Sequence, residues 1–173
     1  MHKESPGILL QRLQSRDAAA LEALYHQLSA SIYTFILRMT GDPTLSEDIL
    51  QEFFVKLYRS PPITLPQNPR AYLFRMAHNL TIDCLKKEPQ TTPISDYHHL
   101  TGSSGTTLVE RLDLERALAA LCAADREIVT LHAGAGLKFR EVAEVVAMPL
   151  GTVLWRYQRA IGKLRELLNG GTP

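Results

Sequence analysis

The chain has 173 residues, of which 45% are hydrophobic and 21% charged, and its formal net charge is +1 at pH 7. This composition is that of a globular protein, and the length suits one ordinary domain or two small ones. No apolar run approaches the roughly 20 residues needed to cross a bilayer, and the start MHKESPG lacks a signal-peptide core, so we expect a cytoplasmic protein. Cys84 and Cys122 lie far apart without CxxC spacing, which favours two reduced, buried thiols.

The front of the chain has apolar residues at the three- and four-residue intervals of amphipathic helices. Residues 8–15 are expected to form a short first helix. A long helix follows, capped by Asp17 and stopped by Gly41. Thr44 and Glu47 have the spacing of a capping box at the start of the next helix. The buried face of that helix is expected to carry Ile49, Phe53 and Leu57.

A proline-rich stretch, PPITLPQNPR, predicts a stiff loop before the next helix. Asn68 can cap that helix, Pro69 suits its first position, and the pattern continues to about Lys87. The core stripe is expected to be Leu73, Met76, Ala77, Leu80 and Cys84.

The pattern disappears over residues 89–107, which are rich in proline, serine, threonine and glycine. Such a composition is typical of a linker, and so long an irregular stretch is unusual inside one compact domain. We therefore place a domain boundary here, with one domain at 1–88 and a second at 108–173.

The second domain is expected to contain four helices, at about 108–122, 125–133, 138–147 and 149–168. The last two are separated by only a few residues around Met148, which predicts a helix-turn-helix. The predicted fold class is therefore all-α, with two small helical domains joined by a flexible linker.

The only tryptophan of the chain, Trp155, lies on the polar side of the last predicted helix. Its apolar stripe consists of Val153, Tyr157, Ala160, Ile161, Leu164 and Leu168. Trp155 falls on the opposite side beside Arg159. Two interpretations stay open: the ring faces a DNA groove, where it can meet thymine methyls or sugars, or it packs against a neighbouring helix or a partner.

Three stretches of the sequence resemble two regions of a known family. The segment ALAALCAADREIVTLHAGAGLKFREVAEVVAMPLGTVLWRYQRAIGKLREL resembles region 4 of the extracytoplasmic-function (ECF) sigma factors of bacterial RNA polymerase. SEDILQEFFVKLYR and PRAYLFRMAHNLTIDCLKK resemble region 2 of the same family. The residues that carry the region 4 match are Leu118, Leu121, Arg126, Glu127, Gly136, Glu141, Ala143, Gly151, Thr152, Val153, Arg156, Arg159, Ala160 and Leu164.

The resemblance implies the partners of the chain. In this family region 2 binds the clamp of core RNA polymerase and melts the minus-ten promoter element. Region 4 reads the minus-thirty-five element and touches the polymerase flap, and an anti-sigma factor commonly holds the protein inactive.

The polymerase-binding surface is expected on the helix that follows Ser46. Opposite its core side this helix carries hydrogen-bond acceptors and one apolar contact: Asp48, Gln51, Glu52 and Val55. Taken alone, such a face is usually only a solvated surface, and it is the resemblance at EDILQEFF that implies contact with core polymerase.

The minus-ten surface is expected on the helix from Arg70, where cations outnumber carboxylates. Opening a duplex needs cations for phosphates, rings for stacking and amides for base edges. By resemblance a flipped base lies between the proline-rich loop and Asn79, although Tyr72 and Phe74 suit core packing equally well. The expected residues are Ile63, Asn68, Arg70, Tyr72, Arg75 and Asn79.

The minus-thirty-five surface is expected on the last helix, which has four cations against one carboxylate. Gly151 and Thr152 let phosphates approach its positive N-terminal end. A bidentate arginine–guanine contact from Arg156 or Arg159 would set the sequence preference. The expected residues are Gly151, Thr152, Trp155, Arg156, Arg159 and Lys163.

The sequence carries no candidate catalytic residue. Its histidines and cysteines lack zinc-site spacing, and it has no phosphate-binding GxxxxGK[ST], nucleophile elbow or HExxH. We therefore expect no metal, no cofactor and no enzyme activity.

Two alternatives to a sigma factor remain: a sigma-like DNA-binding regulator that no longer recruits polymerase, and a decoy that titrates an anti-sigma factor. The intact EDILQEFF argues against the first, and the basic last helix argues against the second.

Overall fold

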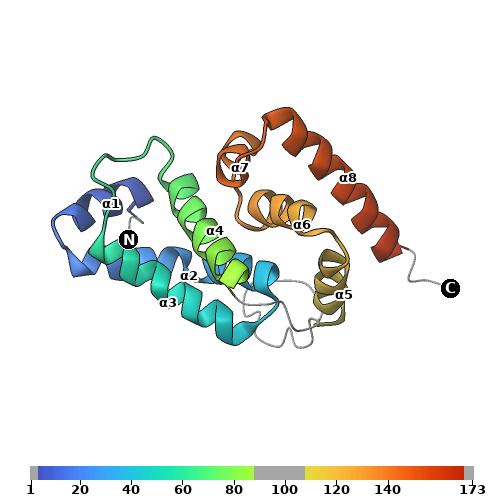
Figure 1. Ribbon diagram of the computed structural model, residues 1–173, viewed down its shortest axis with the longest axis horizontal. Helices are drawn as coiled ribbons and strands as arrows, with labels where there is room; N and C mark the ends of the chain where they lie inside the picture. Colours follow the sequence, from blue (N-terminus) through green and yellow to red (C-terminus); the bar gives the residue numbers. More distant parts are fainter. Residues whose placement is uncertain (1–3, 88–107, 170–173) are drawn as a thin grey trace.

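The computed structural model describes residues 4–87 and 108–169, and the regular secondary structure of these ranges is helical (Figure 1). The predicted linker at 89–107 lies outside the described residues. The all-α class is confirmed. The helices are α1 (Pro6–Gln14), α2 (Ala18–Thr40), α3 (Pro43–Arg59), α4 (Pro69–Lys87), α5 (Leu108–Ala119), α6 (Ala123–Val129), the π-helical segment η1 (Thr130–Gly134), α7 (Phe139–Val146) and α8 (Leu150–Asn169).

The ends of α2 are those that the sequence predicts. The Asp17 carboxylate accepts hydrogen bonds from the N–H groups of Ala19 and Ala20, at 3.0 and 3.4 Å. At the other end Gly41 adopts φ 72°, a left-handed conformation that glycine reaches without steric cost.

The start of α3 differs from the prediction. The helix begins at Pro43, and the side chain of Asp42 caps it by accepting from the N–H of Leu45 at 3.1 Å. The predicted capping box at Thr44 and Glu47 is wrong, because Thr44 already lies inside the first turn. Proline at the first helical position has no N–H to leave unpaired, which suits this earlier start.

The front half has a continuous apolar core. The predicted α3 residues Ile49, Phe53 and Leu57 are all buried. On α4, Leu73, Ala77 and Leu80 are buried, while the predicted Met76 and Cys84 are half-buried. Cys122 is exposed, so the expectation that both thiols are buried is wrong. Phe74 of α4 is fully buried and meets Phe35 of α2 edge to face, with ring centroids 6.0 Å apart. Phe74 is therefore a core residue. Of the two roles that the sequence left open for this ring, base stacking and core packing, the structure shows core packing.

The first helix packs on the start of α4. Leu9, Leu10 and Leu13 of α1 are buried in the core. A Cβ at Gly7 would lie 3.2 Å from Cγ of Pro69, so glycine allows the close approach of α1 to α4.

The rear half contains the predicted helix-turn-helix, formed by α7 and α8. The buried residues Val142, Val145, Val146 and Val153 pack the two helices together. In the turn, Ala147 adopts φ 53° and ψ 44°, the left-handed conformation in which alanine costs on the order of 1 kcal/mol more than glycine. The predicted helix at 125–133 begins earlier, at Ala123, and becomes π-helical from Thr130.

The two halves pack directly against each other, with α4 on α7, and α2 on α6 and η1 (Figure 1). One hydrophobic cluster continues from the front half into the rear half, where it includes Ile128, Leu131 and Val142. Across the boundary the Arg38 guanidinium binds the Glu115 carboxylate through Nη2–Oε1 at 2.6 Å and Nε–Oε2 at 3.2 Å. Arg126 also donates to the backbone carbonyl of Arg38 at 3.0 Å.

Candidate nucleic-acid interface

The outer face of α8 carries an aromatic ring and several cations. Val153, Ala160 and Leu164 are buried on the inner side of the helix. Trp155 lies on the outer side with 58% of its surface exposed. The ring is therefore not buried against a neighbouring helix of this chain, and α8 presents it to solvent, where contact with DNA and contact with a partner both stay open.

Arg159 lies on the ring of Trp155. Its guanidinium carbon is 4.6 Å from the ring centroid, which is the geometry of a cation–π contact. Arg159 also pairs with Asp125 of α6, with Nη2–Oδ2 at 2.6 Å and Nε–Oδ2 at 3.2 Å. Arg156 donates from Nη1 to the other carboxylate oxygen, Oδ1, at 2.9 Å. A single carboxylate therefore holds both predicted DNA-reading arginines.

The charge of Asp125 is stabilised by these two partners. Burial alone would raise the pKa of its carboxyl group, but the hydrogen bonds from Arg159 and Arg156 outweigh burial, so the pKa lies below its usual value. Asp125 is a functional candidate that sequence reasoning missed. An acid in the first turn of a helix is ordinarily explained by the helix dipole alone, so nothing in the local pattern indicated arginine partners more than thirty positions away.

The remaining predicted residues of the minus-thirty-five surface lie along the same helix. Gly151 and Thr152 are exposed in its first turn, with open space where a glycine Cβ would be. Lys163 is exposed and donates to the carbonyl of Ala120 at 3.2 Å. The structure thus brings this predicted set together on α8.

Most of the predicted minus-ten residues also lie on one side of their domain. Asn68, Arg75 and Asn79 are exposed at positions that share one face of α4. Ile63, in the loop before α4, is 97% exposed. Tyr72 shares this face but is half-buried against the core.

Arg70 is set apart from these residues. It lies on the opposite side of α4, where its Nη2 donates to the carbonyl of Ala135 in the rear half at 2.6 Å. The structure therefore does not bring Arg70 together with Arg75 and Asn79.

The loop that carries Ile63 is anchored by α1. Nε2 of Gln14 donates to the carbonyls of Pro62 and Ile63, at 2.7 and 3.1 Å. Sequence reasoning did not indicate this role for Gln14, because the two partners are almost fifty residues further along the chain.

The predicted polymerase-binding residues are exposed on α3. Asp48, Gln51 and Val55 line a groove of about 730 Å³ between α2 and α3. Tyr25 and Phe54 contribute rings to the same groove, with centroids 5.0 Å apart. Glu52 is exposed on α3 but does not line the groove.

A histidine lies at the contact between the two halves. Nε2 of His78 on α4 is 2.9 Å from Oε1 of Glu127 on α6, and both side chains are largely buried. Burial alone would lower the pKa of His78, but the interactions with Glu127 and Asn79 outweigh it, so the pKa lies above 6.5. Folding therefore stabilises the charged imidazole relative to the neutral one.

This pair predicts a dependence of stability on pH. A group whose pKa is raised on folding stabilises the folded state fully below its unfolded pKa, and this contribution is lost as the pH rises through the folded pKa. We expect the free energy of unfolding to fall as the pH rises above about 6.5, and His78→Gln to reduce that fall. Urea unfolding across this range measures the effect. His26→Gln, at an exposed position on α2, should leave the pH dependence unchanged. An identical pH profile for His78→Gln and the unmodified chain would show that the pair contributes nothing.

Among the described residues, no group of three or more histidine, cysteine, aspartate or glutamate side chains is arranged to hold a metal ion. The described helices also include none with the length and hydropathy that crossing a membrane requires.

Comparisons with known proteins agree with this geometry. The sigma-70 region 2 family model matches residues 24–90, and the sigma-70 region 4 model matches residues 111–164. Together the two matches take in most of the chain, in the order that the fold shows. The fold and its basic helix-turn-helix thus define a sigma-70-type transcription initiation factor.

Curated relatives identify the branch of that class. The chain is 29% identical to the ECF RNA polymerase sigma factor SigL of Mycobacterium tuberculosis, over 88% of this chain and 90% of SigL. It is 25% identical to the ECF sigma factor SigK of a Mycobacterium species, over 93% of this chain and 89% of SigK. The chain belongs to the ECF RNA polymerase sigma factors, as its two region motifs imply.

Two solved structures have the same fold. One is CnrH in complex with the cytosolic domain of CnrY, with a TM-score of 0.74 and 24% identity, covering 98% of this chain and 100% of that chain. The other is the sigma factor RpoE of Bartonella quintana, solved with the anti-sigma factor NepR, with a TM-score of 0.69 and 21% identity, covering 87% of this chain and 97% of that chain.

Proposed function

We propose that this sigma factor binds core RNA polymerase through the outer face of α3 and reads the minus-thirty-five element with the outer face of α8. The observation that carries the proposal is the exposed pair of Trp155 and Arg159 on the second helix of a helix-turn-helix. This helix enters the major groove in proteins that use the motif. A ring and a guanidinium there supply an apolar contact and a fork of donors for base edges.

We further propose that the minus-ten element is opened on α4 and the adjoining loop. Arg75 and Asn79 offer a cation for phosphate and an amide for a base edge, and the exposed Ile63 offers an apolar contact. Arg75 and Asn79 share one face of α4, and Ile63 lies in the loop before that helix, within the proposed front domain of residues 1–88. Arg70 would join them only after leaving Ala135.

We infer that the chain acts in the cytoplasm without a catalytic centre of its own, under the control of an anti-sigma factor. The groove between α2 and α3 supports this inference, because its lining combines apolar and aromatic side chains with two carboxylates, Glu47 and Asp48, against one cation, Arg59, and so suits an amphipathic, basic segment of a partner. The same surface would serve polymerase and inhibitor in turn, so that the two exclude each other.

Run-off transcription with purified core RNA polymerase tests the main proposal. A sigma factor starts transcripts at defined positions on a promoter template. A DNA-binding regulator without polymerase recruitment would bind the template and give no transcript, and an anti-sigma decoy would do neither. Absence of defined transcripts would therefore contradict the proposed function.

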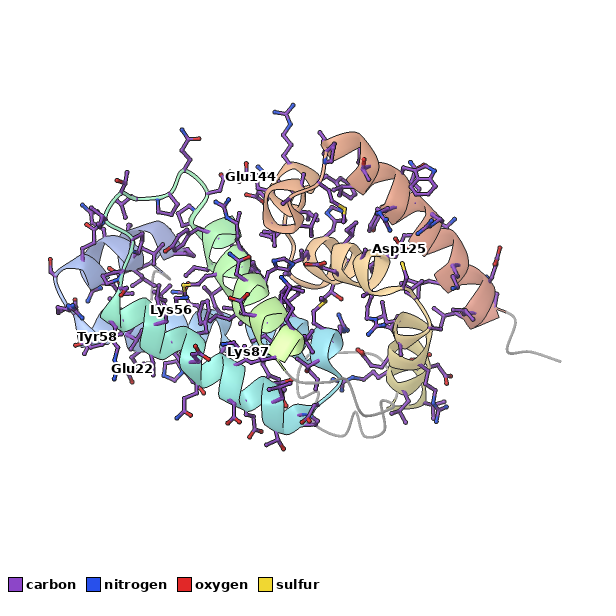
Figure 2. All side chains as sticks on the ribbon, viewed as in Figure 1. Glu22, Lys56, Tyr58, Lys87, Asp125 and Glu144 are labelled. Atoms are coloured by element: carbon purple, nitrogen blue, oxygen red, sulfur yellow. The ribbon has the colours of Figure 1, made fainter. Side chains whose placement is uncertain are left out.

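Glu52→Lys is expected to weaken binding to core polymerase by at least about tenfold, because placing like charges together across an interface costs several kcal/mol. Fluorescence anisotropy of the labelled chain titrated with core polymerase measures the change. Glu144→Lys makes the same charge change on α7, away from α3 (Figure 2), and should leave the affinity intact. Equal affinities for the two variants would remove α3 from the interface.

Arg159→Ala is expected to weaken binding to promoter duplex by about 1–3 kcal/mol, the value of a bidentate contact to guanine. If the guanidinium also contacts a phosphate, the slope of log K against log salt should become shallower by about 0.9. Binding measured at several salt concentrations gives both numbers. Arg165→Ala removes an exposed cation nearer the C-terminal end of α8 and serves as the matched control. Unchanged binding for Arg159→Ala would place this residue outside the interface.

A further inference from the structure

Asp125 is an acid placed among the cations of the proposed DNA-binding surface. It lies on α6, toward α8 (Figure 2), and only 6% of its side chain is exposed. Both of its oxygens are used, Oδ1 by Arg156 and Oδ2 by Arg159. A carboxylate beside a surface that binds phosphates opposes binding by its charge, so its presence calls for a specific role.

We propose that Asp125 is a positioning residue for base recognition: it fixes the guanidinium of Arg159 in the orientation that reads guanine, and it neutralises one of two arginine charges that would otherwise bind phosphates without regard to sequence. The proposal rests on the proposed DNA-binding function of α8 and adds the residue that makes this binding selective.

The orientation follows from the atoms that are already in use. A guanidinium has two edges that offer paired donors, one with Nε and Nη2 and one with Nη1 and Nη2. Asp125 takes the first edge, because Oδ2 accepts from both Nε and Nη2 of Arg159. Trp155 covers one face of the same group. On the second edge, Nη2 also donates to Sγ of Cys122, a long and weak bond of 3.9 Å. A base that displaces this contact meets two parallel donors, Nη1 and Nη2, which match O6 and N7 of guanine.

Arg156 is held in a more enclosed position. Only 27% of its side chain is exposed, compared with 47% for Arg159. Its Nε is buried with no hydrogen-bond partner in the described part of the chain. Arg156 is therefore the less accessible of the two arginines that pair with Asp125, and Arg159 is the one that can reach a base.

Asp125→Asn separates a positioning role from a purely structural link between α6 and α8. The amide keeps the shape of the side chain, but it loses the charge and one acceptor oxygen. The full chain is incubated with a 20-base-pair duplex library of randomised sequence, and the bound duplexes are sequenced. The unmodified chain should enrich guanine at one position by at least about fivefold, and Arg159→Ala should abolish that enrichment.

Asp125→Asn should reduce the guanine enrichment to less than about twofold. The variant should also bind a larger fraction of the unselected library, and the slope of log K against log salt should steepen by about 0.9 for one additional phosphate contact. Asp125→Glu keeps the charge but displaces the oxygens. It should therefore bind the unselected library as weakly as the unmodified chain does and show only part of the guanine enrichment. Glu115→Gln is the matched control, because it changes an equally buried, arginine-paired carboxylate and should leave the enrichment intact. Thermal melting establishes that each variant is folded.

The possible failures are distinguishable. If the unmodified chain enriches no sequence, the proposed function of α8 is wrong, and this inference is wrong with it. If Arg159→Ala abolishes the enrichment but folded Asp125→Asn retains it in full, only the inference about Asp125 is overturned. If Asp125→Asn does not fold, Asp125→Glu decides, and full enrichment by that variant would overturn the positioning role.

Discussion

Replacing Phe74 with alanine is expected to lower the free energy of unfolding by about 3–5 kcal/mol, the usual cost of removing a fully buried phenylalanine. The ring is fully buried, and it packs edge to face on Phe35 between α2 and α4. Its removal takes away apolar burial and leaves a cavity that the surrounding helices can close only in part. Urea unfolding of the full chain measures the loss through the shift in midpoint at constant slope.

Trp155→Ala provides the comparison for Phe74→Ala. This ring is exposed and contacts Arg159 through a cation–π interaction. Its removal should therefore lower the free energy of unfolding by less than about 1 kcal/mol. If Phe74 served to stack on an unpaired base, its replacement would weaken promoter opening and leave stability nearly unchanged. That result would contradict its place in the core.

Arg38→Met is expected to destabilise the closed arrangement of the two halves by about 3–5 kcal/mol. The variant leaves Glu115, whose side chain is only 6% exposed, without its bidentate partner. A buried carboxylate without a partner is costly, and separation of the halves would restore its contact with water. Small-angle X-ray scattering should therefore report a larger radius of gyration for this variant.

The double variant Arg38→Met/Glu115→Leu tests the cause. Removing both partners avoids the isolated charge, and an apolar pair of similar size is often neutral or stabilising in place of a buried ion pair. The double variant should therefore return to the compact form. An unchanged radius of gyration for Arg38→Met alone would mean that the ion pair does not hold the halves together.

The sequence predicted those features of the fold that are encoded locally. Asp17 and Gly41 bound α2 as expected, because a capping carboxylate and a left-handed glycine act within a few residues of the helix end. The error at α3 has the same local character. Asp42 and Thr44 are both good capping residues only two positions apart, and Pro43 favours the earlier of the two.

The contacts between the halves were not predictable in this way. Arg38 and Glu115 are 77 residues apart, and a single charged side chain carries no information about a partner at that distance. Asp125 is a similar case, since its position in the first turn of a short helix explains its presence without reference to α8. For the candidate site, the sequence indicated which side chains of α8 face outward but not which acid orients them.

The hydrophobic cluster that continues from the front half into the rear half has a consequence for work with fragments. In the intact chain α6, η1 and α7 cover the sides of α2 and α4 that face the rear half. A recombinant front half produced alone would therefore expose hydrophobic surface that is buried in the intact chain. Such a fragment should need a solubilising fusion or a bound partner to remain monodisperse. Heating the intact chain should melt both halves in one calorimetric peak, because the two halves share one hydrophobic cluster.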